Sequence, residues 1–353
     1  MCIGKQDMNF NYFSEQSSLP LVISPNKEDA TKETLVSWIN EHNAEVEQYL
    51  NTSGALLFRG FTIHSPMDFE AVARAIDKDL KNDYMGTSPR DKKTEYVFSA
   101  SELPSHYPIM QHCEMSFLPT APRRLFFYCH VEPTYGGETP ICDFRKVYKD
   151  LDPVVRDAFE KKGVKHIRNY SSPLDNRKSA FQLKKWNELF QTTDKAVVEQ
   201  KCLDNDILCE WKEQDGLRMI NKSEAVKTHP VTGEKVWFNH TQVFHVDAAA
   251  DEYRRIHRRQ QRWETFKTMW LLNLLTTYNK IIKDPMQQSM HVTFGDDSPI
   301  PDAYVTHIQD TIWKHLVIQS WRKGDILCID NFSTSHGRMP YFGPREIMVS
   351  WTS

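Results

Sequence analysis

The strand-forming segments of this chain are short, apolar and widely separated, and this arrangement limits the folds it can adopt. Residues 54–61 (GALLFRGF) and 123–133 (RRLFFYCHVEP) have the apolar and aromatic content of buried strands, and the second segment ends at a proline. Two further strand patterns, GDILCIDN and REIMVSW, stand near the C-terminus and are joined by the turn-rich FSTSHGRMPYFGP. Helical patterns lie before and between the strands, without the regular alternation of a doubly wound sheet. This order predicts an α+β fold whose core is a jelly-roll barrel with helical additions.

Hydrophobic periodicity predicts where the helices lie. Apolar residues recur at helical spacing in five segments, which are 29–52, 68–77, 144–162, 248–283 and about 301–316. Residues 229–244 (HPVTGEKVWFNHTQVF) have the form of a strand, a tight Thr-Gly turn and a second strand. The polar stretch 170–215 indicates no definite element. We expect one domain over 1–353, with a helical insertion at about 246–285.

Composition excludes several classes of protein. The formal net charge is -3 and the pI about 6.5, so the basic excess needed to bind nucleic acid is absent. The longest apolar run, MWLLNLL at 269–275, is too short to span a bilayer, and MCIGKQDMNF has no apolar signal-peptide core. Seven cysteines without a CxxC pair are typical of reduced thiols. We therefore expect a cytoplasmic protein that acts on a small molecule, with no nucleic acid or membrane partner.

A histidine and a carboxylate stand two positions apart in MQHCEMSF, residues 110–117. Alternate side chains of an extended strand share a face, so His112 and Glu114 would project together and hold a divalent metal from one side. His336, in the turn after GDILCIDN, is the preferred third ligand, because Arg345 opens the neighbouring strand. The competing histidines are His130, His240, His245 and His307. Two histidines and one carboxylate on one face of iron form the facial triad of non-haem Fe(II) oxygenases, which leaves positions open for a 2-oxo acid and dioxygen.

Six stretches of the chain resemble the taurine dioxygenase (TauD/TfdA)/clavaminate synthase superfamily of Fe(II)- and 2-oxoglutarate-dependent oxygenases. They are GALLFRGF, YPIMQHCEMSF, LFFYCHVEPTYGGETPICDFRKVY, KVWFNH, VTFGDDSPIP and GDILCIDNFSTSHGRMPYFGPREI, and together they span most of the chain from 54 to 351. Within the superfamily, the chain is most similar to the branch of syringomycin-synthesis-type amino acid hydroxylases and clavaminate synthase-like proteins. The HxE block is specific only in combination with GGETP and HGR…R. The resemblance implies a double-stranded β-helix of the clavaminate synthase-like type.

The resemblance also implies roles for individual residues. Carried over onto this sequence, it makes His112, Glu114 and His336 the iron ligands. It implies that Thr139, in the GGET turn, donates its hydroxyl to the distal carboxylate of 2-oxoglutarate and that Arg345 is the ion partner of that carboxylate, for which a planar guanidinium is well suited. Because Glu114 fills the position that related halogenases leave to chloride, the resemblance implies hydroxylation or desaturation.

We therefore expect an Fe(II)- and 2-oxoglutarate-dependent dioxygenase that uses O2 to hydroxylate an unactivated C–H bond, with release of succinate and CO2. The expected substrate is small and amino-acid-like, either free or tethered to a carrier protein. Its expected contacts are Glu102, for an ammonium group, and Arg338 and Asn239, for a carboxylate or amide. Two alternatives stay open: a desaturase or cyclising oxidase on the same iron site, and a non-catalytic 2-oxoglutarate-binding protein.

Overall fold

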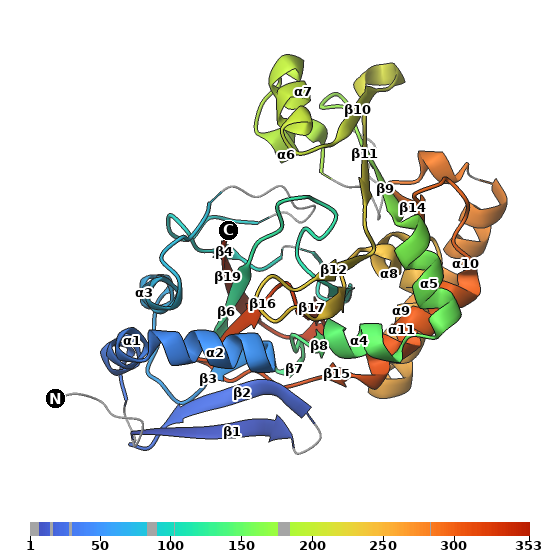
Figure 1. Cartoon of the computed structure of the whole chain (residues 1–353). Coiled ribbons are helices and arrows are strands. Elements are labelled where there is room, and N and C mark those ends of the chain that lie inside the picture. The colour runs from blue at the N-terminus through green and yellow to red at the C-terminus, as the bar shows by residue number, and fades with distance from the viewer. Residues whose placement is uncertain are drawn as a thin grey trace.

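The computed structural model describes residues 7–14, 17–27, 30–82, 90–101, 103–175, 184–282 and 284–353. Two β-sheets form its centre, and helices cover them on either side (Figure 1). The strands expected at the start, middle and end of the chain are present and pair with one another. This is the jelly-roll core with helical additions that the strand pattern predicts.

The larger sheet contains seven strands. They are Met8–Ser14 (β1), Ser17–Pro25 (β2), Ala55–Phe58 (β3), Phe98–Ser99 (β4), Arg124–Val131 (β6), Ile326–Asp330 (β16) and Glu346–Thr352 (β19), in the spatial order β1-β2-β3-β16-β6-β19-β4. Only the β2–β3 pair is parallel. Leu327 on β16 stands opposite Leu57 on one side and Phe127 on the other, so three distant strand segments meet in one register.

The smaller sheet carries the C-terminal histidine. Its strands are Ile109–His112 (β5), Ile141–Asp143 (β8), Leu316–Val317 (β15) and Thr334–Arg338 (β17), in the antiparallel order β15-β8-β17-β5. A two-stranded ribbon of Tyr135–Gly136 (β7) and Tyr341–Phe342 (β18) continues from β17.

Side chains of the larger sheet alternate between two cores, as the two-residue period of a strand requires. Leu57 and Phe127 join Ile141 of β8 in the core that lies between the two sheets. Phe58 and Phe126 point the other way, into the core beneath the N-terminal helices. Both faces of the larger sheet are therefore buried, which explains its nearly continuous apolar strands.

Three helices cover the outer face of the larger sheet: Lys32–Glu41 (α1), Asn43–Ser53 (α2) and Pro66–Ile76 (α3). The single helix expected over 29–52 is divided at His42. The imidazole of His42 stacks on Trp38, with ring centroids 5.1 Å apart, and its Nδ1 donates to the Trp38 carbonyl at 3.0 Å, which closes α1. Gly54, at φ 81°, ends α2 in the left-handed conformation.

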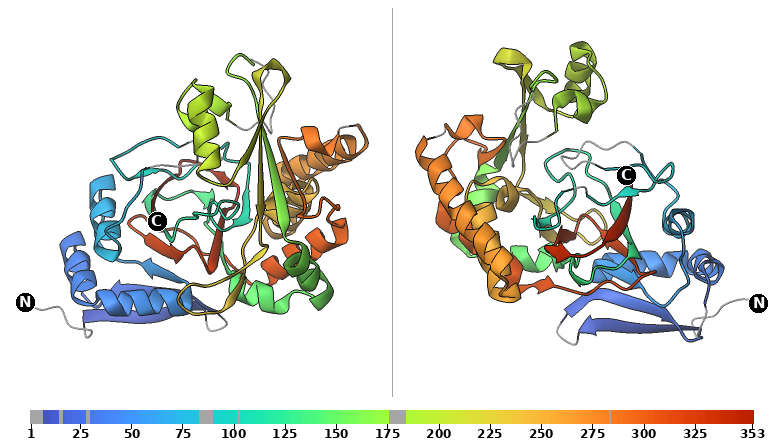
Figure 2. Two further views of the ribbon diagram at one scale, coloured as in Figure 1. Left: turned by 45° about the horizontal axis from the view of Figure 1, so that its top comes forward. Right: turned by 180° about the vertical axis from the view of Figure 1, so that it is seen from behind.

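A third sheet contains Val164–Tyr170 (β9), Leu208–Trp211 (β10), Leu217–Ser223 (β11) and Met290–Phe294 (β14), in the order β10-β11-β9-β14. The helices of this half are Phe144–Asp150 (α4), Pro153–Lys162 (α5), Trp186–Phe190 (α6) and Lys195–Leu203 (α7). The helix expected over 144–162 is divided because Pro153 disfavours a helical residue before it. The stretch 170–215, for which the sequence indicated no element, contains α6, α7 and β10, and these lie at the far end of the projecting β9–β11 pair (Figure 2).

The strand–turn–strand expected over 229–244 is displaced. The paired strands are Val226–Thr228 (β12) and Lys235–Trp237 (β13), and the second ends well before residue 244. Asn239 accepts the backbone N–H of Thr241 through its side-chain oxygen at 2.9 Å, a turn that leads the chain out of the strand. Residues Thr241–Phe244 form the short helix α8.

On the side of the core away from α1–α3 lie Ala248–Gln260 (α9), Trp263–Ile282 (α10) and Asp302–Lys314 (α11) (Figure 1). Within the described residues, single-turn 3-10 helices stand at Glu213–Asp215 and Pro285–Gln287. The chain reverses between α9 and α10 at Gln261, whose φ is 49°. Within the described residues, no helix combines the length and apolar content needed to cross a membrane.

A buried carboxyl group ties α9 to α11. Glu252 is 6% exposed, and its Oε2 accepts the indole N–H of Trp313 at 2.9 Å. Burial raises the pKa of Glu252 from 4.5 to about 7. Folding therefore favours the protonated form. The contribution of this group to stability is most favourable below pH 4.5, and it is lost as the pH rises through about 7.

We predict that Glu252→Gln, which cannot ionise and keeps an acceptor for Trp313, raises the free energy of unfolding above pH 7 by up to about 3 kcal/mol. At a pH near 4, below the ordinary pKa of a glutamate, the variant and the wild-type protein should be nearly equal. Urea unfolding at the two pH values measures both differences. Glu264→Gln, an exposed position on α10, is the control. A stability difference that does not vary with pH would contradict the assignment.

Candidate metal centre and active site

The pairing of β5 with β17 brings two distant histidines together. In this antiparallel pair His336 stands directly opposite His112, and the centroids of the two imidazole rings are 4.4 Å apart. Glu114 Oε2 lies 3.9 Å from His112 Nε2 and 3.7 Å from His336 Nε2. One potential ligand atom from each of the three residues lies within 4.8 Å of the others. The structure thus assembles the three candidate ligands into one compact cluster.

Glu114 reaches this cluster by a route different from the one that the strand argument assumed. Strand β5 ends at His112, and Glu114 begins a turn in which Met115 has a φ of 51°. The HxE pair therefore converges because of this turn and not because of strand alternation. The turn conformation itself must be fixed by tertiary contacts, since a left-handed methionine is strained by itself.

Both imidazoles have the form that a metal ligand requires. His112 Nδ1 donates to the Met110 carbonyl at 2.8 Å, which leaves the lone pair of Nε2 free and directed at the cluster. Burial, together with the nearby His112 and Arg90, lowers the pKa of His336 well below its ordinary value, so this ring is neutral. Two imidazoles and one carboxylate are a donor set that suits Fe(II), and the residues present therefore fit a metal ion of this kind.

An arginine that sequence reasoning did not identify contacts the carboxylate. Arg90 donates to Glu114 Oε2 at 3.1 Å and to the Ala100 carbonyl at 2.9 Å, and both side chains are 7% exposed. The guanidinium therefore restrains Glu114 with its Oε2 toward the histidines. Arg90 stands in no recognisable motif, and only the folded chain brings it to the HxE turn.

The backbone of Glu114 is held by the side chain of Asn331, at the C-terminal end of β16. Asn331 Oδ1 accepts the Glu114 N–H at 2.6 Å, and Asn331 Nδ2 donates to the carbonyls of Glu114 at 3.0 Å and Pro122 at 2.8 Å. Asn331 is fully buried. Asn331 is therefore a two-point clamp on the turn that carries the carboxylate.

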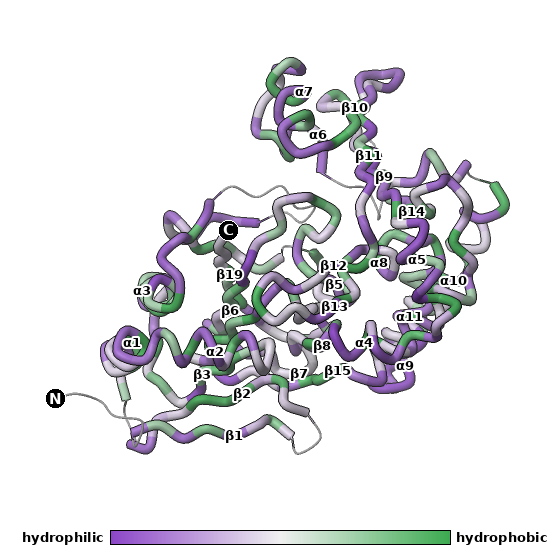
Figure 3. Tube along the Cα trace, viewed as in Figure 1, coloured by the Kyte–Doolittle hydropathy of each residue, from purple (hydrophilic) through white to green (hydrophobic). Residues whose placement is uncertain are grey.

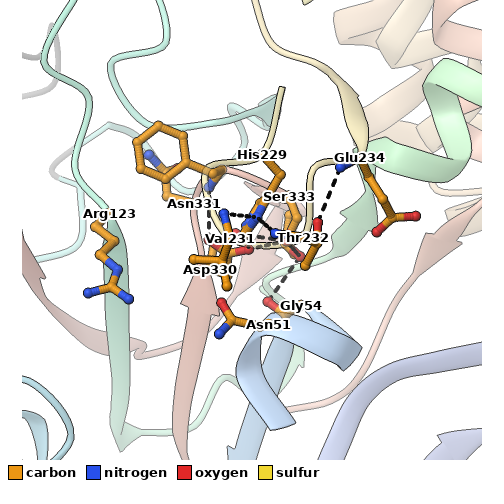
Figure 4. A network of polar contacts seen from close by, with 12 residues as sticks. Asn51, Gly54, Arg123, His229, Val231, Thr232, Glu234, Asp330, Asn331 and Ser333 are labelled. Atoms are coloured by element: carbon orange, nitrogen blue, oxygen red, sulfur yellow. Dashed lines mark hydrogen bonds and ion pairs between the residues drawn. The ribbon is translucent and has the colours of Figure 1, made fainter. Parts of the chain in front are cut away.

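A second buried network fixes the segment from which Asn331 projects (Figure 4). His229 Nδ1 accepts the N–H groups of Val231 and Thr232, so its Nε2 carries the proton and donates to Asp330 Oδ2 at 2.8 Å. Ser333 Oγ also donates to Asp330 Oδ2, and the Asp330 N–H donates to the Gly54 carbonyl at 2.9 Å. These bonds fix the turn between β16 and β17, and with it the entry to His336.

The cluster opens into a small pocket that the two predicted 2-oxoglutarate contacts also line. The lining residues are Arg90, Ala100, Ser101, Ile109, His112, Glu114, Phe127, Thr139, His336, Gly337, Arg338 and Arg345. Thr139 is 3% exposed and its Oγ1 accepts the Trp321 indole N–H at 3.1 Å, so its own hydroxyl proton can be donated elsewhere. Burial and the neighbouring Arg338 lower the pKa of Arg345. A bound carboxylate would relieve that unfavourable burial of positive charge.

The GGET turn makes room for Arg345. Gly137 has a φ of 70°, and a Cβ added there would lie 2.9 Å from Arg345 Cδ and 2.9 Å from Tyr341 Cβ. Arg345 Nε donates to the Gly137 carbonyl at 2.8 Å. A glycine at this position therefore lets the arginine stem pass close to the turn, and this links the GGET motif to the terminal arginine in space.

The three predicted substrate contacts have different surroundings. Arg338 lines the pocket, but its guanidinium donates to the carbonyls of Leu103, Pro104 and Tyr107, so it also holds the loop before β5. Asn239 is fully buried, donates to the Ala225 carbonyl and does not line the pocket. Glu102 lies outside the described residues.

Of the competing histidines, His240 and His245 have polar partners of their own. His240 is buried beside His112, with ring centroids 5.3 Å apart, and its Nδ1 lies 2.7 Å from Ser116 Oγ. His245 forms a second group with Asp247 and Asp302. Lys280 donates to both of these aspartates, at 2.5 and 2.7 Å, so an ammonium group already occupies the place of a cation there.

Comparison with known proteins gives a consistent result. A family model described as "Taurine catabolism dioxygenase TauD, TfdA family" matches residues 17–351. The dapdiamide synthesis protein DdaC of Enterobacter agglomerans is 29% identical over 86% of this chain and 84% of its own length. A clavaminate synthase-like protein of Arabidopsis thaliana is 30% identical over 95% of this chain and 94% of its own.

Solved structures share the fold at low sequence identity. AAD-2, in a complex with Mn(II) and N-oxalylglycine, is 13% identical with a TM-score of 0.53, over 98% of this chain and 96% of its own. PvcB of Pseudomonas aeruginosa is 11% identical with a TM-score of 0.53, over 99% of this chain and 92% of its own. PvcB is described as an Fe, alpha-ketoglutarate dependent oxygenase from an isonitrile synthetic pathway.

We predict that His112→Ala and His336→Ala abolish Fe(II) binding without unfolding the chain, because both rings line the open pocket. Asn331→Ala should weaken Fe(II) binding by about 10- to 100-fold, as is usual for residues that orient a ligand. Anaerobic titration with Fe(II), together with circular dichroism, measures both effects.

The matched control is Asn169→Ala, because Asn169 also donates to two backbone carbonyls, those of Met286 and Gln288, but lies on β9. It should lose stability and keep Fe(II) affinity. Full Fe(II) affinity in both histidine variants would rule out the ligand assignment.

Proposed function

The chain belongs to the taurine catabolism dioxygenase TauD, TfdA family and is an Fe(II)- and 2-oxoglutarate-dependent dioxygenase, and on this premise we propose the reaction that it catalyses. It hydroxylates an unactivated C–H bond of a small amino-acid-like substrate, so that 2-oxoglutarate, O2 and R–H give succinate, CO2 and R–OH. The observation that carries the proposal is the cluster of His112, Glu114 and His336 at one end of a pocket that Thr139 and Arg345 also line.

Each residue of the cluster has a defined task. His112 and His336 would hold Fe(II) through Nε2, and Glu114 would hold it through a carboxylate oxygen that Arg90 restrains. When bound there, Fe(II) supplies the activation of O2 that oxidation of a C–H bond requires. The chain supplies the geometry: the Asn331 clamp and the β5–β17 register keep the three donors on one side and leave the other side to ligands.

We assign the binding of 2-oxoglutarate to the part of the pocket that Thr139 and Arg345 line. Arg345 is the cation for the distal carboxylate, and the Thr139 hydroxyl donates a hydrogen bond to it. Trp321 supports this assignment, since its indole N–H occupies an acceptor site of Thr139 Oγ1 and leaves the hydroxyl proton for an anion. A charge-assisted bond to a buried carboxylate is among the stronger polar contacts in proteins.

The charge of the pocket lining supports an anionic, amino-acid-like substrate. Arg90 and Arg338 bring guanidinium groups to the pocket, together with Ser101 from the loop before β5. A substrate carboxylate matches the positive charge of such a surface, and an analogue that lacks it would lose this charge-assisted contact. Glu102, next to Ser101 in sequence, is proposed for the substrate ammonium group. The proposal covers a free amino acid and one tethered to a carrier protein. Both forms present the ammonium group and the side chain, whereas only the free amino acid also presents a carboxylate.

We predict that Arg345→Ala raises the 2-oxoglutarate concentration needed for half-maximal succinate formation. Losing one partner of a partly buried charge pair costs about 2–5 kcal/mol, or roughly 30- to several-thousand-fold in affinity. Arg345→Lys should recover only part of this, because an ammonium group cannot make the two-point contact. Lys323→Ala, an exposed cation outside the pocket, is the control. Unchanged affinity in Arg345→Ala would place the anchor elsewhere, with Arg338 the next candidate.

We also predict that the substrate is an amino acid or an amino acid on a carrier protein. Anaerobic enzyme loaded with Fe(II) and 2-oxoglutarate is titrated with amino acids, carrier-bound amino acids, taurine, aryloxyacetates and peptides, and the iron–2-oxoglutarate absorption is followed. Responding compounds are then turned over with O2, and the product mass distinguishes hydroxylation, a gain of one oxygen, from desaturation, a loss of two hydrogens. A response to sulfonates or aryloxyacetates alone would exclude the amino acid assignment. If no compound in the panel leads to succinate formation, and none is formed without a substrate either, only the alternative of a non-catalytic 2-oxoglutarate-binding protein would remain.

A further inference from the structure

Helix α10 exposes an unusual amount of apolar surface. Its large apolar residues include Trp263, Trp270, Leu274 and Ile281, which are 62%, 58%, 54% and 75% exposed. Only Thr265 and Leu272 of this helix are buried. The helix lies at the edge of the molecule, away from the N-terminal sheet (Figure 1), and carries hydrophobic residues along its course (Figure 3). Monomeric proteins rarely leave so large an apolar patch uncovered.

The exposed residues form a regular stripe. Alternate steps of four and three residues define the positions 263, 267, 270, 274, 277 and 281, all of which are exposed. This is the spacing of the contact seam in a coiled coil. Leu271, Tyr278 and Ile282 flank the seam and are also exposed. The opposite side of α10 packs on α9, where Leu272 and Met269 contact Tyr253 and Ala250.

The order of residue types in the stripe is symmetric about its centre. Reading from either end it is apolar, polar, apolar, apolar, polar, apolar, with Lys267 and Thr277 at the two polar positions. In an antiparallel pair of identical helices centred on residue 272, Trp270 meets Leu274 of the other copy and Lys267 meets Thr277. A two-fold dimer requires such a self-complementary surface, in which residue i meets residue j and j meets i.

We propose that α10 is the two-fold interface of a homodimer, in which this stripe packs antiparallel against the same stripe of a second copy. A parallel pair is disfavoured, because it would place two Lys267 ammonium groups side by side. In the antiparallel pair the two ammonium groups stand roughly 15 Å apart along the helix axis, at 1.5 Å per residue.

The available area is sufficient for a stable dimer. The seven exposed large apolar side chains of α10 together present roughly 800 Å², which is about what each partner buries in an interface of standard size. Aromatic residues, here two tryptophans and a tyrosine, are the side chains that contribute most to such contacts. The stripe lies outside the pocket that holds His112 and Arg345, so the dimer is independent of the proposed reaction.

Two of the cations beside the stripe, Lys280 and Arg262, favour a protein partner over a lipid surface. A helix that lies on a membrane uses free Lys and Arg to reach anionic headgroups. On α10, Lys280 is held between Asp247 and Asp302. Arg262, just before the helix, lies over the rings of Tyr135 and Phe342, at 4.9 and 4.2 Å from their centroids. Both groups are directed at this chain and not at an external surface.

The first test measures the oligomeric state of the full chain by light scattering and sedimentation at micromolar concentrations. The wild-type protein should be a dimer. Trp270→Glu with Leu274→Glu should raise the dimer dissociation constant by about a hundredfold or more, since it removes central contacts and adds like charges. The control, Val154→Glu with Leu203→Glu, changes residues on α5 and α7 that are 66% and 71% exposed, and it should remain a dimer. Unchanged circular dichroism shows that both variants are folded.

The second test fixes the orientation of the helices. Trp270→Cys with Leu274→Cys should form a covalent dimer with a short bismaleimide, because these positions meet in the antiparallel pair. Lys267→Cys alone should not, because its two copies are far apart. The same reaction on the wild-type protein gives the background cross-linking through its own cysteines. Cross-linking through Lys267→Cys and not through the double variant would overturn the antiparallel arrangement.

Three results would overturn the proposal as a whole. The first is a wild-type protein that is monomeric throughout this concentration range, and the second is a dimer that the glutamate variant does not weaken. The third is a monomer that co-sediments with vesicles of phosphatidylcholine and phosphatidylglycerol through α10, which would assign the stripe to lipid.

Discussion

The antiparallel pairing of β5 with β17 is the contact on which the site depends. It places His336 directly opposite His112, although the two residues come from opposite ends of the barrel sequence. The pairing is in turn fixed by the larger sheet, because β16, which leads into β17, is inserted between β3 and β6. A shift of one residue in that register would turn the imidazole to the other face of its strand. The position of the candidate metal ligands is therefore a property of the whole sandwich.

Buried hydrogen bonds convert this pairing into a defined geometry. Glu114 does not lie in a strand, and its position depends on the clamp from Asn331 and on the Arg90 guanidinium. Asn331 projects from a turn that Asp330 and His229 secure. A buried polar group that loses its partner costs about 1–3 kcal/mol, so each of these bonds favours a single conformation of the turn. The apolar core by itself would fix the strands but not the carboxylate.

The arginines show how similar side chains acquire different tasks from their surroundings. Arg338 donates to three backbone carbonyls and so supports the loop before β5. Arg345 passes the GGET turn at Gly137 and reaches the pocket, where burial lowers its pKa. Arg90 contacts the candidate metal ligand itself. A bound anion is thus best matched at Arg345, because the pKa of this guanidinium is lowered and the Thr139 hydroxyl lines the same pocket.

The sequence by itself determined the central strands β3, β6, β16 and β19, the family and the candidate site residues, because these depend on local patterns: apolar strand segments, HxE, the GGET turn and the terminal HGR…R. It did not determine the break at His42, the end of β13 or the elements within 170–215, where tertiary contacts and turn bonds override short-range preference. Only the tertiary structure decided that Glu114 lies in a turn, that Asn331 and Arg90 hold it, and which face of α10 remains exposed. These depend on residues distant in the chain, and their contacts form only when the sheets have packed.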